Sequence, residues 1–226
     1  DRSVSRGLGD VYKRQVQIDE KNMLTWLILN NISIAEAPTL PIQYNKGNAL
    51  KAASEIAAMA NARTLTIETI KESLNKYGIL YIEVPKLDKA PIDAFSTMAD
   101  AHPVITVTYR YNDMDKLVFD VLHELCHIDR HLTKEQTAFI SVDDGSYATD
   151  PREKEANEFA RQTLIPDTVW GDIMKVGCKS LSPFKIVKTI AITAESKGIS
   201  PSIAVARYKH DTNWYNTSAY RSPKIS

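Results

Sequence analysis

The sequence predicts an α+β fold in which a small mixed or antiparallel sheet packs against helices. The first observation is a cluster of three short segments rich in β-branched and aromatic residues, at 79–84, 92–98 and 104–111. The second is that segments with apolar residues at helical spacing flank this cluster on both sides. The chain has 226 residues, of which 43% are hydrophobic, so it is long and apolar enough to bury a core.

Composition and charge exclude several classes of protein. The 28 Lys and Arg residues are balanced by 28 Asp and Glu residues, so the chain lacks the basic surface typical of nonspecific nucleic-acid binding. Two cysteines are too few to stabilise a fold of this size through disulfides, and this favours a reducing, cytoplasmic location. No apolar run approaches the ~18 residues that cross a bilayer, and no signal peptide is visible, so we expect no membrane partner.

The first fifteen residues are expected to be foreign to the protein. The string SRGLGDVYKRQ, at residues 5–15, resembles the translation of a transposon-end sequencing adapter. The alternative is a natural basic tail. We therefore leave residues 1–15 out of the fold prediction, and we expect a native segment to be missing upstream of residue 16.

Residues 16–78 are predicted to form a helical N-terminal region. A short helix around Trp26 is followed by a linker that contains prolines. The Ala-rich segment 48–61 repeats its apolar residues at helical spacing, and a second helix over 66–77 ends at Gly78. Because the chain is neutral and these segments are rich in alanine, we expect the two helices to pack against the core rather than to bind DNA.

Residues 79–212 are predicted to form the main domain, and residues 213–226 a loose polar tail. Apolar and polar residues alternate over 104–111, which is typical of a strand at the edge of a sheet. We expect a helix over 113–131, capped by Asn112 or Asp113, and then a loop over 133–149 with a turn at 143–145. Asp150 is expected to open the next helix, which ends by Ile165. Two more helices are expected over 167–176 and 183–197.

The sequence HELCH at residues 123–127 is an H-E-x-x-H motif. On a helix, His123 and His127 lie on one face, so both imidazoles can reach a single zinc ion. Glu124 lies about 100° round the helix, where a general base can take a proton from a zinc-bound water. The alternative, two histidines without a metal, is disfavoured by the spacing. Cys126 is expected to be a buried small residue rather than a ligand.

A catalytic zinc site needs a third protein ligand. His131 shares the helix face, but in a regular helix it lies about 12 Å along the axis from His123, which disfavours it as a ligand. Glu153 is the better candidate because it shares a helix face with small alanines that permit close packing. Since it follows Asp150 by three residues, it would also suit a capping box. Asn157, one turn later, could orient a ligand histidine through a hydrogen bond.

The motif and the downstream helix EKEANEFARQTLIP together resemble the ImmA/IrrE family of zinc metallopeptidases, most closely members fused to a helix-turn-helix domain, some of which are described as HigA-like antitoxins. The resemblance covers about residues 20–212 and is strong over 103–166. It implies a zincin-like domain with one zinc ion held by His123, His127 and Glu153, and Glu124 as the general base. The family positions are here His123, Glu124, His127, Glu153, Ala156, Asn157, Phe159, Ala160 and Pro166.

The resemblance also implies what the protein acts on. Family members are thought to cleave a partner repressor, so we expect a zinc-dependent endopeptidase whose substrate is a repressor or another regulatory protein. Contact with DNA is expected only through a missing N-terminal helix-turn-helix domain. The alternative is a non-proteolytic, antitoxin-type regulator whose zincin-like domain senses a ligand or partner. The presence of Glu124 beside a full ligand set favours the enzyme, and a purely structural zinc site would favour four Cys or His ligands.

Three further expectations concern the surroundings of the motif. An extended substrate could add a strand along 104–111. Glu155 and Glu158 fall on other faces of their helix and are expected to be solvated. The candidates for stabilising the oxyanion are Tyr109, Arg130, His131 and Tyr147.

Overall fold

The computed structural model describes residues 18–100, 102–133, 137–142, 150–176 and 182–225. The predictions for residues 1–15, for the turn at 143–145 and for Tyr147 lie outside these residues. The described part of the chain forms helices and a small mixed sheet, which confirms the predicted α+β class.

The helices are α1 (Glu20–Glu36), α2 (Asn48–Ala62), α3 (Ile67–Lys76), α4 (Met114–Cys126), α5 (Pro151–Leu164), α6 (Asp167–Lys175), α7 (Pro183–Ser196) and α8 (Pro201–Thr212). A π-helical turn, η1 (His127–His131), follows α4. The strands are β1 (Leu80–Glu83), β2 (Ile92–Ala99), β3 (His102–Val107) and β4 (Ala138–Val142). The predicted helices and the three predicted strands are present, but the strand predicted over 104–111 ends at Val107. Strand β4 lies in the segment predicted as a loop, and α8 was not predicted.

The strands form a sheet in the order β1-β3-β2-β4. Strand β3 pairs with β1 in parallel and with β2 in antiparallel orientation, and its residues are all buried. The prediction that 104–111 forms an edge strand open to substrate is therefore wrong: Val104, for example, faces Leu80 on one side and Thr97 on the other. Within the described residues, β4 forms one edge of the sheet and pairs with β2.

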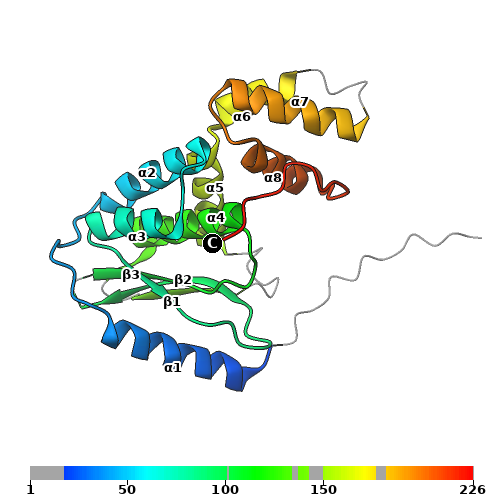
Figure 1. Ribbon diagram of the computed structural model, residues 1–226. Helices are drawn as coiled ribbons and strands as arrows, with labels where there is room; N and C mark the ends of the chain where they lie inside the picture. The colour runs from blue at the N-terminus through cyan, green and yellow to red at the C-terminus, as the bar shows by residue number, and fades with distance from the viewer. Residues whose placement is uncertain (1–17, 101, 134–136, 143–149, 177–181, 226) are drawn as a thin grey trace, which may run out of the picture.

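Helix α1 covers one face of the sheet, and α2, α3 and α4 cover the other (Figure 1). The Trp26 side chain anchors α1 because it is fully buried and packs edge-on against Phe95, with ring centroids 6.0 Å apart. The indole N–H of Trp26 donates to the hydroxyl of Thr108 at 3.0 Å. The buried polar group thus has its partner, and the ring adds apolar area to the smaller of the two cores.

The main core lies between α2, α4 and the sheet. Helix α2 turns a stripe of small residues inward, which permits close approach of helix backbones. On α4, Leu122 and Leu125 are fully buried in the same core. The prediction that segment 48–61 packs rather than binds DNA is consistent with this burial. The buried residues of the α2 stripe are Ala49, Ala52, Ala53, Ile56, Ala57 and Ala60.

Helix α4 begins at a conventional cap and ends in an unusual turn. Asp113 is the N-cap, and its carboxylate accepts a hydrogen bond from the backbone N–H of Lys116 at 2.9 Å. The predicted helix over 113–131 is α-helical only to Cys126. Beyond it the backbone widens, because the N–H of Leu132 donates to the carbonyl of His127 five residues earlier, at 2.8 Å.

The C-terminal residues are docked, and the expectation of a loose tail over 213–226 is wrong for its last residues. The N–H of Met114 donates to the carbonyl of Pro223 at 2.9 Å, and the N–H of Asp115 donates to the Ser222 hydroxyl at 2.8 Å. The N–H of Ile225 donates to the side chain of Asn112 at 2.7 Å. The tail is held because it satisfies backbone groups at the start of α4 that have no partner within the helix.

Helices α6, α7 and α8 lie together beside the end of α5 (Figure 1). Arg207 of α8 is buried and joins this layer to α5, since its guanidinium donates to the carbonyl of Ile165 and to the carboxylate of Asp167, both at 2.6 Å. Across the described ranges, no helix combines the length and the apolar character that a bilayer crossing requires.

Candidate metal centre

Two imidazoles reach the site from the end of α4. His123 lies in its last turn and His127 opens η1, so the two side chains stand one turn apart on one face. Both are buried, with 8% and 0% of the side chain exposed. The fully buried Leu122 and Leu125 fix the rotation of the helix about its axis, which holds the histidine face toward α5.

A carboxylate reaches the same point from the first turn of α5. Asp150 is the N-cap of this helix, and its carboxylate accepts from the N–H of Arg152 at 2.8 Å. Asp150 caps the helix, but Glu153 does not complete a capping box, because its buried carboxylate is directed at the two imidazoles instead of back at the N-cap. Ala156 and Ala160, on the same face, are fully buried and permit α5 to pack closely on α4.

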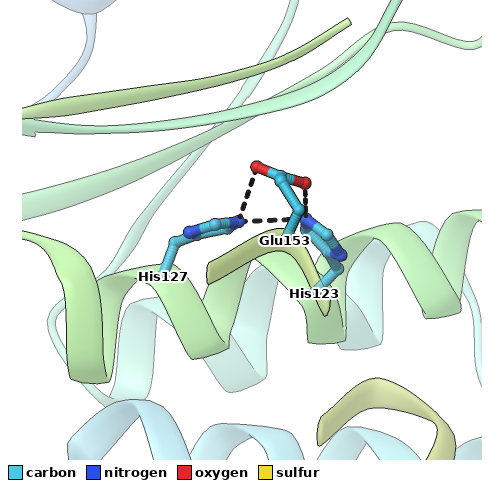
Figure 2. Close-up of side chains that lie close together, drawn as sticks. All are labelled: His123, His127 and Glu153. Atoms are coloured by element: carbon cyan, nitrogen blue, oxygen red, sulfur yellow. Dashed lines mark hydrogen bonds and ion pairs between the residues drawn. The ribbon is translucent and has the colours of Figure 1, made fainter. Parts of the chain in front are cut away.

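The three side chains point toward one another (Figure 2). Nε2 of His123 lies 3.0 Å from Nε2 of His127 and 3.1 Å from Oε2 of Glu153, and Nε2 of His127 lies 3.4 Å from Oε1 of Glu153. Ligand atoms in a tetrahedral zinc site lie about 3.3 Å from one another, given metal–ligand distances of 2.0–2.1 Å. The donor set and its spacing therefore fit one metal ion. Within the described residues this is the one group of three or more potential ligands that meets.

The charges of the site support one another. Burial opposes the ionisation of Glu153, but the hydrogen bonds and charges of His123 and His127 lower the pKa of its carboxyl to about 2. Burial also disfavours the charged form of His123, yet the hydrogen bond to Glu153 and the nearby charges of Glu124 and Asp120 raise its pKa above the ordinary value. The pocket thus favours positive charge, which protons or a metal cation can supply, and the two compete.

Asn157 contacts the outer side of the first imidazole. Its side-chain oxygen lies 3.0 Å from Nδ1 of His123, and it follows Glu153 by one turn of α5. An N–H at Nδ1 that donates to this oxygen leaves the lone pair of Nε2 toward the site, which is the tautomer that a metal requires. The structure thus places Asn157 where the sequence analysis expected an orienting residue.

Glu124 and Cys126 have different environments on the same helix. The Glu124 side chain is fully buried next to the histidines, and its charge acts on His123. A buried carboxylate is costly and is common where it serves a chemical role. Cys126 is a fully buried free thiol whose pKa is raised by that burial to about 12. The thiol is therefore protonated and packed, as predicted, and lies outside the triad.

His131 and Glu155 form contacts that the sequence analysis missed. His131 is outside the triad, as expected, but its Nδ1 lies 2.9 Å from Nδ1 of His127 and its Nε2 lies 3.1 Å from Oε2 of Glu155. Glu155 was expected to be merely solvated. Its carboxylate is half exposed, yet it also accepts from the guanidinium of Arg130 at 2.6 Å. The four-residue spacing of His127 and His131 is the feature of the sequence that could have indicated their contact.

The candidates for stabilising the oxyanion have other partners in the described structure. The hydroxyl of Tyr109 lies 2.8 Å from that of Tyr81. Arg130 pairs with Glu155, and His131 lies behind His127.

Fold and site define a class of protein: an α+β domain of zincin-like type with a candidate metal centre built from an H-E-x-x-H helix and a glutamate from the next helix. Residues 74–182 match the family model described as the IrrE N-terminal-like domain, Peptidase_M78. The matched segment carries the whole triad, and the match supports the resemblance to the ImmA/IrrE family that the motifs indicate. No curated protein matches the chain.

Proposed function

We propose that the protein is a zinc-dependent endopeptidase whose metal ligands are His123, His127 and Glu153. The observation that carries this proposal is the convergence of two imidazoles and one carboxylate, with Glu124 buried beside them. Two histidines and one glutamate form the ligand set of many catalytic zinc sites, which keep a position open for water or substrate. The match to Peptidase_M78 supports the same class of activity.

Zinc in such a site lowers the pKa of a bound water toward about 7 and polarises a substrate carbonyl. Glu124 accepts the proton of the attacking water as its oxygen bonds to the peptide carbonyl carbon. Glu124 then returns the proton to the leaving nitrogen as the C–N bond breaks, so the carboxylate is regenerated. Asn157 holds His123 in the orientation that the site needs.

The substrate that we propose is a partner repressor or another regulatory protein. An extended segment of such a substrate would pair with an open strand edge, and β3 is unavailable because β1 and β2 cover both of its edges. Within the described residues β1 and β4 are the two edges of the sheet, and β4 is the candidate because its partner β2 contacts α4 and η1, which carry the histidines. We also propose that the protein has a regulatory role and that it contacts DNA only through a domain outside this sequence.

The experiment compares the zinc-loaded wild type with Glu124→Gln and with Glu158→Gln as a matched control. Glu158 lies on α5 and pairs with Arg161 and Gln162 on its own helix. The test substrates are purified transcriptional repressors, including any that is encoded beside the gene, and the reaction runs in water enriched in oxygen-18. We expect a new carboxyl end that carries the label in wild type and control, and a loss of about 10²-fold or more in Glu124→Gln, with zinc retained.

Two results would contradict this proposal. One is cleavage by Glu124→Gln at the wild-type rate. The other is a wild type with stoichiometric zinc that leaves neighbouring repressors intact, which would favour a regulator that senses a ligand without proteolysis.

A further inference from the structure

His127 has a partner on the side of its ring that faces away from the triad. Its Nε2 faces Glu153 and His123, while its Nδ1 lies 2.9 Å from Nδ1 of His131. His131 is itself buried, with 7% of its side chain exposed, and its Nε2 lies 3.1 Å from Oε2 of Glu155. A hydrogen-bonded chain therefore runs from Glu155 through His131 to the back of His127.

The π-helical turn η1 builds this chain. It begins at His127 and ends at His131, and it is closed by the bond from the N–H of Leu132 to the carbonyl of His127. The two rings lie 4.9 Å apart between centroids, with their planes inclined by 58°. This inclination lets the Nδ1 atoms meet, where parallel rings would stack face on. Single π-helical turns of this kind are frequent at functional sites.

Helix α5 anchors the far end of the chain. Glu155 follows Glu153 by two residues, so one helix supplies both a triad member and the terminal carboxylate. The second oxygen of Glu155 accepts from Arg130 at 2.6 Å, which holds the carboxylate between two donors although its side chain is 46% exposed. The position of His131 is thus fixed from two elements, η1 and α5.

The donors and acceptors of this chain assign its protons. A carboxylate only accepts, so Nε2 of His131 donates to Glu155. Nδ1 of a neutral His131 is then an acceptor, and it takes the proton on Nδ1 of His127. The lone pair of His127 is left on Nε2, the atom that faces Glu153. This is the tautomer in which an imidazole binds a metal through Nε2.

We propose that His131 is a positioning residue that holds His127 in the tautomer and orientation for metal binding, with Glu155 as its anchor. The inference rests on the proposed metal site and adds residues to it. Each ligand histidine then has an outer partner held by α5: Asn157 acts directly on His123, and Glu155 acts on His127 through His131. Such outer hydrogen bonds raise the metal affinity of the ligand that they hold.

Four variants separate this role from simple packing. His131→Leu fills the space but offers no acceptor to His127, whereas His131→Gln offers a side-chain oxygen that can accept the same proton. Glu155→Ala removes the anchor at an exposed position, where folding is least at risk. The control is Glu158→Ala, which removes a half-exposed glutamate of the same helix that pairs with Arg161.

The readouts are zinc affinity, measured by competition with a chelator, and the nitrogen-15 shifts of the histidine rings in the zinc-loaded protein. We expect His131→Leu to weaken zinc binding by about 10- to 100-fold and Glu155→Ala by a smaller factor of about 3 to 10. His131→Gln should recover most of the loss, and Glu158→Ala should bind as the wild type does. The wild-type spectrum should show a protonated Nδ1 and a metal-bound Nε2 on His127.

Several results would overturn the inference. Zinc affinity unchanged in His131→Leu and Glu155→Ala would remove the positioning role while leaving the metal site standing. Equal losses in the Leu and Gln variants would assign His131 to packing. A wild type that binds no zinc at all would overturn the metal site itself, and this inference with it.

Discussion

Nδ1 of His123 lies 3.0 Å from the side-chain oxygen of Asn157, one helical turn after Glu153 on α5. The helix that supplies a potential ligand therefore also orients a second one. The close packing of α4 and α5 that makes this possible depends on small residues at the contact, Ala156 and Ala160. A change at Asn157 should consequently act on metal binding more than on folding.

We predict that Asn157→Leu weakens zinc binding by about 10- to 100-fold, because it removes the acceptor that orients His123. Asn157→Asp keeps an acceptor at the same place and should retain most of the affinity. Competition with a chelator measures both, and thermal unfolding in the presence of EDTA reports whether the metal-free fold is intact. Equal affinity in the Leu variant and the wild type would show that the contact has no influence on the metal.

The turn that leads from α3 into the sheet depends on Gly78. Its backbone has φ +75°, and a Cβ there would lie 2.7 Å from the backbone nitrogen of Tyr44. Gly78→Ala should lower the free energy of unfolding by about 3 kcal/mol, from the strained φ and from the displaced backbone. Gly198 has φ +74° with open space around it, so Gly198→Ala should cost only about 1 kcal/mol. Urea unfolding measures both, and equal losses would refute the steric part of the argument.

Asp120 gives the fold a specific pH dependence. Burial raises the pKa of the Asp120 carboxyl to about 6. The ammonium group of Lys116, 2.8 Å away, and the nearby His123 lower this pKa, whereas the charge of Asp93 raises it. A raised folded pKa means that its contribution to stability is present at low pH and is lost as the pH rises through 6. From pH 4.5 to 7, the wild type should lose about 2 kcal/mol relative to Asp120→Asn. Urea unfolding of both proteins in EDTA measures the difference, and a difference that does not vary with pH would contradict this assignment.

The sequence was most informative where the chemistry is local. The spacing of His123 and His127 follows from helical periodicity, and Asp150 and Pro151 mark the start of α5, so the face that carries Glu153 could be placed from the sequence. The burial of Cys126 was likewise predictable, because it lies within an apolar helix face. These predictions needed no knowledge of how distant segments pack.

The predictions that failed depended on tertiary pairing. Strand β3 alternates in sequence like an edge strand, but the pairing of β1 along its open side buries it, and only the strand order reveals this. Strand β4 is short and lies among polar residues, so its pairing with β2 decides its structure. Helical periodicity places His127 and His131 on one face, but it does not predict the π-helical turn η1 in which their Nδ1 atoms meet.

The most direct test of the account is the zinc content of the purified wild type, Glu153→Ala and Glu158→Ala after exhaustive dialysis, measured by elemental analysis. Glu153 contacts both imidazoles, whereas Glu158 lies on the same helix and pairs with Arg161. We predict one zinc per chain in the wild type and in Glu158→Ala, and far less than one in Glu153→Ala. If Glu153→Ala keeps one zinc per chain, or if the wild type holds none, the proposed metal centre is wrong.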